Sequence, residues 1–71
     1  MNMNEKIALI KKALETETEL TASTVLEKVE EWDSMGKIAI VVMLDKNFKV
    51  TLTADQIEGL KTMQDILAYM E

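Results

Sequence analysis

The chain has 71 residues, of which 48% are apolar, 30% are charged and 4% are aromatic, a composition typical of one small globular domain. It contains no cysteine and no histidine, which excludes disulfides, thiolate metal sites and the usual base of a nucleophilic serine. The net charge is −5, and an acidic chain without a basic stripe is a poor candidate for binding nucleic acid.

The first predicted helix covers residues 3–14, where Met3, Ile7, Ile10 and Leu14 fall on one face. A polar connection follows in residues 15–32, and a connection of this length is usually functional or contains a turn of its own. The capping-box spacing of Thr24 and Glu27 predicts a short helical turn near residues 25–31. Four apolar residues are expected to hold the connection against the core: Leu20, Val25, Leu26 and Trp32.

The second predicted helix begins at Asp33–Ser34 and runs to about Phe48, after which residues 49–53 turn the chain. A short third helix follows Thr53, with Gln56 at capping-box spacing, and ends near Gly59. The fourth begins after Thr62 and runs to the end of the chain. Its inward residues are expected to be Met63, Ile66, Leu67 and Met70.

These elements predict an all-α fold in a single domain, residues 1–71. The expected architecture is a small helical bundle of three main helices and one short helix, with a long loop between the first and second helices. The longest apolar run, residues 38–44, is far shorter than the ~20 residues needed to cross a bilayer. Since no signal peptide is recognisable either, we expect no membrane span and a cytoplasmic location.

The second helix has two apolar stripes where a peripheral helix needs one. At 100° per residue, one stripe consists of Ile40, Val41, Leu44 and Phe48. The opposite stripe consists of Met35, Ile38, Ala39 and Val42. With only three other helices available, we expect the second stripe to be partly exposed and free to meet a partner.

Ser34 lies at the start of this helix, directly after Asp33, which is a good N-cap residue. A nucleophilic serine needs a neighbouring base, and the chain has no glycine-rich loop or recognisable metal-ligand spacing, so we do not expect an enzyme. An acceptor serine needs no base of its own, because the modifying enzyme supplies the chemistry. The free amides and dipole of a helix N-terminus would stabilise a phosphodiester attached there.

The acidic residues are concentrated just before this serine. Residues 15–33 contain seven acids and one lysine, and their negative field would favour an electropositive partner. Acidic loops also keep small proteins in solution without any partner, and that explanation stays open.

The run Asp33–Ser34–Met35, opening an apolar second helix after a long acidic loop, resembles the Asp–Ser–Leu attachment motif of acyl carrier proteins. The similarity extends to the C-terminus, whereas the residues before 30 match only in layout. It includes Phe48, the segment Val50–Thr51–Leu52, the residues Thr53–Ala54–Asp55, the run from Lys61 to Asp65, and Tyr69.

The resemblance implies a non-catalytic carrier whose cofactor is 4′-phosphopantetheine, derived from coenzyme A and attached covalently to Ser34. A phosphopantetheinyl transferase would attach it with Mg²⁺, and the thiol of the arm would hold acyl or aminoacyl groups as thioesters. The other implied partners are an acyl- or aminoacyl-loading ligase and a downstream transferase or synthase. Asp33 would belong to the motif as well as capping the helix. The docking surface implied by the family consists of Met35, Ile38, Val42 and Leu52. The residues implied to surround an acyl chain are Ile40, Leu44, Leu60 and Leu67.

Fatty-acid carriers usually display several acids along this helix, but here Gly36, Lys37, Ala39 and Lys46 occupy the corresponding region. With the Trp32–Asp33–Ser34 opening, this favours a dedicated carrier of small acyl or aminoacyl groups; fatty acyl, short acyl and aminoacyl cargo all stay open. The alternative is a helical protein–protein interaction module in which Ser34 is unmodified. In either case we expect a monomer.

Overall fold

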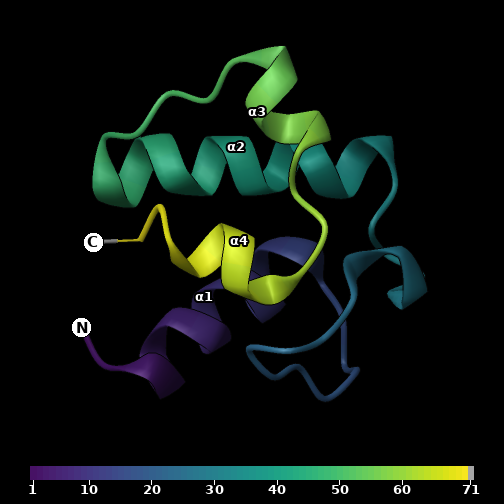
Figure 1. Ribbon diagram of the computed structural model, residues 1–71. Helices are drawn as coiled ribbons and strands as arrows, with labels where there is room; N and C mark the ends of the chain where they lie inside the picture. Colours follow the sequence, from purple (N-terminus) through teal and green to yellow (C-terminus); the bar gives the residue numbers. More distant parts are fainter. Residues whose placement is uncertain (71) are drawn as a thin grey trace.

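The structure is a computed structural model that describes residues 1–70. It contains four α-helices, α1 (Met3–Leu14), α2 (Ser34–Phe48), α3 (Ala54–Glu58) and α4 (Met63–Leu67), shown in Figure 1. One turn of 3₁₀ helix, Leu26–Lys28, lies in the connection between α1 and α2. No strand occurs within residues 1–70, so the all-α fold class is confirmed.

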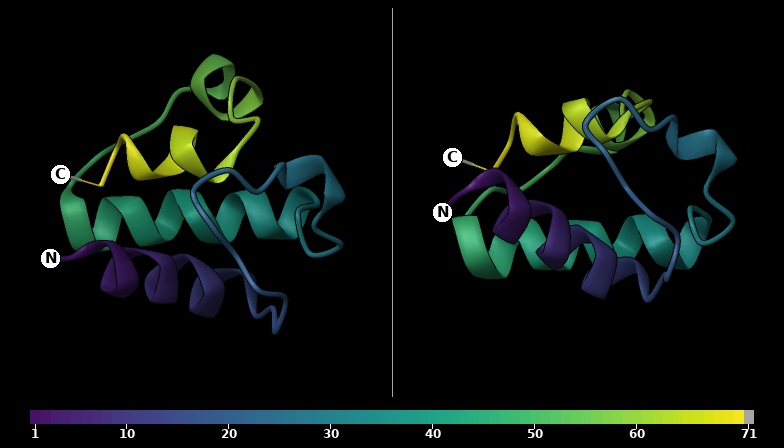
Figure 2. Two further views of the ribbon diagram at one scale, coloured as in Figure 1. Left: turned by 60° about the horizontal axis from the view of Figure 1, so that its bottom comes forward. Right: turned by 90° about the horizontal axis from the view of Figure 1, so that it is seen from below.

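Helices α1 and α2 lie side by side and run in opposite directions, while α4 lies against α2 and runs in the same direction as α2 (Figures 1 and 2). The short α3 lies over the first half of α2. The core forms between α1, α2, α4 and the long connection. Its largest fully buried side chains are Ile10, Leu26, Ile40, Leu44, Met63, Ile66 and Met70. Both termini lie near the C-terminal end of α2, away from its first turn.

Local caps explain where the helices begin. Asn2 and Glu5 form a reciprocal capping box at α1, with backbone-to-side-chain hydrogen bonds of 2.8 and 3.2 Å. The predicted capping box at α3 is confirmed, because the Gln56 N–H donates to Thr53 Oγ1 at 3.2 Å and the Thr53 N–H donates to Gln56 Oε1 at 2.8 Å. The predicted starts of the helices therefore agree with the structure.

The prediction that the fourth helix runs to the end of the chain is wrong. Helix α4 has five residues, and the bundle contains two long and two short helices rather than three main helices and one short one. After Leu67 the Tyr69 N–H donates to the Ile66 carbonyl and the Met70 N–H to the Leu67 carbonyl, both at 3.0 Å. These i to i+3 bonds tighten the chain beyond the α-helical pitch, and Met70 is wholly buried there. Glu71 lies outside the described residues.

The long connection also differs in detail from the prediction. Thr24 does not cap the 3₁₀ turn; its Oγ1 instead accepts the Thr21 N–H at 2.8 Å, and the N-cap position falls on Val25. Val25 forms an isolated antiparallel bridge with Thr62 and is 40% exposed, so the prediction that it helps to hold the connection against the core is wrong. Leu20 and Leu26 are buried and Trp32 is half-buried, as expected. Val29, which the sequence did not single out, is buried with them.

Candidate functional site

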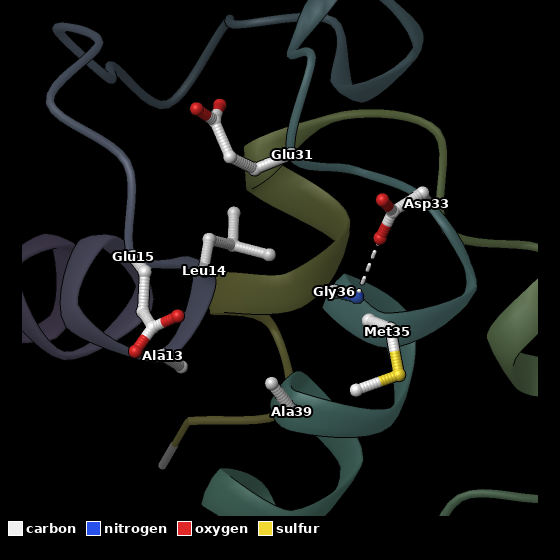
Figure 3. A pocket seen from close by; sticks show the side chains of 8 residues that line it. All are labelled: Ala13, Leu14, Glu15, Glu31, Asp33, Met35, Gly36 and Ala39. Atoms are coloured by element: carbon white, nitrogen blue, oxygen red, sulfur yellow. Dashed lines mark hydrogen bonds between the residues drawn. The ribbon is translucent and has the colours of Figure 1, made fainter.

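Ser34 is the first residue of α2, and its side chain is exposed. The predicted N-cap is present, because Asp33 Oδ1 accepts the Gly36 N–H at 2.9 Å (Figure 3). Within residues 1–70 the Ser34 hydroxyl has no hydrogen-bond partner. The cap therefore fixes the backbone on which Ser34 sits while the hydroxyl itself stays accessible.

The first turn of α2 packs closely against the residues that lead into it, and Gly36 makes this packing possible. A Cβ atom on Gly36 would overlap the Glu31 carbonyl oxygen and lie 3.1 Å from Leu14 Cδ2. Figure 3 shows Glu31 and Leu14 on the α1 side of this turn. Sequence reasoning did not identify this role. The available signal was the glycine itself, which costs about 1 kcal/mol relative to alanine inside a helix and so indicates a close approach.

The second apolar stripe of α2 is exposed, as expected. Met35 is 74% exposed, Ile38 is 58% exposed and Val42 is 56% exposed, whereas Ala39 is half-buried. Large apolar side chains with more than half of their surface in water, aligned on one helix, form a patch suited to contact another molecule. Their assignment to a partner surface stays a prediction.

Leu52 does not belong to this patch. We expected it in the docking surface, but it is 7% exposed and packs in the core from the segment that leads to α3. The expected inward residues Ile40, Leu44, Leu60 and Leu67 are all buried. Whether they surround an acyl chain stays a prediction.

A groove of about 350 Å³ opens beside Ser34, between α2 and α3. Its lining is Ser34, Lys37, Ile38, Val41 and Val42 from α2, with Ile57 and Glu58 from α3. Most of these side chains are apolar. The two charged ones meet across the groove, where Lys37 Nζ lies 3.9 Å from Glu58 Oε1.

A second hollow, of about 450 Å³, lies on the other side of the first turn, between α1 and α2 (Figure 3). It does not include Ser34. Three carboxylates border it, those of Glu15, Glu31 and Asp33. The Oε1 atom of Glu31 is buried and has no hydrogen-bond partner in the described part of the chain. The first turn of α2 is therefore acidic on its α1 side and has a lysine on its α3 side.

Comparison of the chain with protein-family models, with curated proteins and with solved structures finds no match in any of the three. Within residues 1–70, no helix combines the length and apolarity that a bilayer crossing requires. In the same residues, no three or more acidic side chains are grouped so that they could hold a metal ion.

Proposed function

We propose that this chain is a carrier of the acyl carrier protein type, in which Ser34 holds 4′-phosphopantetheine. The observation that supports it best is the position of Ser34 on the first residue of a 15-residue helix, just after its capping carboxylate. Its hydroxyl is exposed and has no hydrogen-bond partner among residues 1–70. A mostly apolar groove includes the same residue, and an exposed apolar stripe begins at the next one, Met35. An attachment point, a surface for partner enzymes and space beside the arm would thus lie together.

The attachment chemistry requires little from the chain itself. Ser34 Oγ forms a bond to the β-phosphorus of coenzyme A, and the bond from that phosphorus to the leaving 3′,5′-adenosine bisphosphate breaks. The hydroxyl proton goes to a base of the transferase, so the absence of histidine here is no obstacle. The chain contributes the exposed hydroxyl and the N-terminal end of α2, whose dipole favours the new negative charge.

The arm would supply a thiol that holds cargo as a thioester. The charged residues of α2 would influence which partner enzymes bind the carrier. Lys37 and Lys46 place positive charge on a helix where fatty-acid carriers usually show acids. We therefore favour a carrier of short acyl or aminoacyl groups, in a pathway whose loading ligase and downstream transferase or synthase present less basic surfaces.

Intact mass spectrometry tests the attachment directly. The protein is incubated with coenzyme A, Mg²⁺ and a broad-specificity phosphopantetheinyl transferase. We expect one phosphopantetheinyl group on the parent, none on Ser34→Ala, and one on Ser23→Ala, which removes an exposed loop hydroxyl as a control. No addition by several transferases to a folded parent chain would overturn the proposal.

The alternative is a helical interaction module with an unmodified Ser34, and the exposure of Met35, Ile38 and Val42 favours it as a second candidate. Both functions use the same stripe, so binding experiments alone do not separate them. The mass measurement does, because only a carrier must accept the arm at Ser34.

A further inference from the structure

The single ion pair found within residues 1–70 joins α3 to α2, at the groove beside Ser34. Helix α3 has no buried residue, and its apolar contact with the core comes from the half-buried Ile57. The pair between Lys37 and Glu58 is therefore a polar contact that, together with Ile57, joins this short helix to the rest of the molecule.

Lys37 lies in a position that calls for a nearby anion. It is close to the N-terminus of α2, where the helix dipole disfavours a positive charge, and the first turn of α2 contains no acidic residue. Glu58 is the only carboxylate that lines the groove. The Lys37 side chain is 34% exposed and that of Glu58 is 75% exposed, so water and other anions compete easily for this pair.

Ser34 and Lys37 are three residues apart on α2 and line the same groove. Side chains at this spacing are neighbours on a helix surface, about 5–6 Å apart at Cβ. A phosphodiester on Ser34 Oγ would place a permanent negative charge within reach of the flexible lysine stem.

We infer that Lys37 binds the phosphodiester of the arm and gives up Glu58 when Ser34 is modified, so that attachment loosens α3 from α2. This inference rests on the proposed function. Glu58 then faces Lys61, which borders the adjoining hollow together with Glu27, Lys37 and Glu58. Lys61 lies three residues after Glu58 in the chain, so a contact between Lys61 and Glu58 would not hold α3 to α2. The groove beside the arm would open as a result.

Two readouts on protein whose modification is verified by mass test the inference. The first is the ³¹P resonance of the attached arm. Lys37→Gln is expected to shift this resonance, because the ammonium beside the phosphorus is lost, whereas Lys46→Gln, on another face of α2, leaves it unchanged. An arm resonance that is the same in Lys37→Gln as in the parent would overturn the inference.

The second readout is amide hydrogen exchange at Ile57 and Gly59, whose N–H groups donate to the carbonyls of Thr53 and Asp55, each at 3.0 Å. Attachment of the arm should speed their exchange about threefold, the effect expected for loss of a partly exposed ion pair. Unmodified Glu58→Gln should already show the faster rate, and modification should add nothing to it. Equal exchange in the modified and unmodified parent would contradict the inference.

Different results would overturn the proposed carrier function and the inferred role of Lys37. If no phosphopantetheine is added to the folded parent, the proposed function falls and the role of Lys37 falls with it. If the arm is added but Lys37→Gln leaves the ³¹P resonance unchanged, or α3 exchanges at the same rate with and without the arm, only the role of Lys37 is overturned.

Discussion

Gly36 lies where the chain leading into α2 folds back across the first turn of the helix. The Asp33 N–H donates to the Glu31 carbonyl at 2.9 Å, and this tight turn brings the same carbonyl against Gly36. Asp33, Ser34 and Gly36 therefore depend on one another structurally. The Asp33 cap requires the turn at residues 31–33, and this turn leaves no room for a Cβ atom at position 36.

Gly36→Ala should lower the free energy of unfolding by about 1–3 kcal/mol, because the added Cβ overlaps backbone that cannot move without disturbing the cap. Gly59→Ala is the matched control. Its Cβ would lie 3.4 Å from the nearest atom, and its φ of −79° suits alanine. That variant should be neutral or gain about 0.4–1 kcal/mol. Urea unfolding of both variants measures the difference, and equal stability would show that the turn before α2 adapts freely.

At the scale of elements, α4 is tied to the long connection by backbone bonds. The Leu26 N–H donates to the Lys61 carbonyl and the Met63 N–H to the Thr24 carbonyl, each at 2.9 Å. Asp65 fixes the turn into α4, since its Oδ2 accepts the N–H groups of Lys61 at 2.9 Å and Thr62 at 3.1 Å. These two backbone hydrogen bonds lower the pKa of Asp65 below its ordinary value of 3.8.

Asp65→Asn should therefore lower stability in a pH-dependent way. The folded-state pKa of Asp65 is depressed, so its contribution is fully present above the ordinary pKa and is lost as pH falls through the folded-state value. At pH 7 we expect the free energy of unfolding to fall by about 0.5–1 kcal/mol. The hydrogen bonds to a charged carboxylate are replaced by hydrogen bonds to a neutral amide, at a site that is partly exposed to water.

Thermal unfolding between pH 7 and pH 2 measures this effect. The stability curves of parent and Asp65→Asn should converge as the pH falls below 3.8. Glu17→Gln, an exposed change in the connection, serves as the control. A gap between parent and Asp65→Asn that stays constant with pH would contradict the assignment.

The beginnings of the helices were predictable from sequence, and their spatial contacts were not. Caps such as Asp33 and the Thr53–Gln56 pair act within three residues, so they can be recognised in the sequence. The bridge between Val25 and Thr62 joins residues far apart in the chain, and Val25 is 40% exposed although its residue type suggests the core. The early end of α4 likewise depends on the burial of Met70 in a core formed by other elements.

Over the whole molecule, the apolar side chains divide into those that stabilise the fold and those that do not. The core surrounds Ile40 and Leu44 on one side of α2, while the stripe that contains Ile38 faces water on another. Leu52 lies on the core side of this division, although its position in the sequence suggested the surface.

Substitution distinguishes the two sets. Leu52→Ala should cost about 2–3 kcal/mol, since it leaves a cavity in the core. Ile38→Ala should change stability by no more than about 0.5 kcal/mol, because the side chain is 58% exposed. Chemical unfolding of the two variants provides the comparison. Equal losses would show that the stripe is part of the core in solution.

The candidate site was predictable only in part, because some of its features are local in sequence and others depend on packing between distant segments. Asp33, Ser34 and the stripe on α2 are local in sequence, and the structure places them where the pattern indicates. The groove and the ion pair between Lys37 and Glu58 depend on how α3 lies over α2. That placement follows from the packing of the segments on either side of α3, which no short motif encodes.

The N-terminus and the last described residues lie at the C-terminal end of α2, opposite the turn that bears Ser34 (Figure 2). A linker joined to either end would therefore leave the serine facing outward. The molecule could be immobilised on a bead or a sensor chip, or fused to a fluorescent reporter, without obstructing the modified end. Immobilised in this orientation, every copy would present Ser34 to an enzyme in solution.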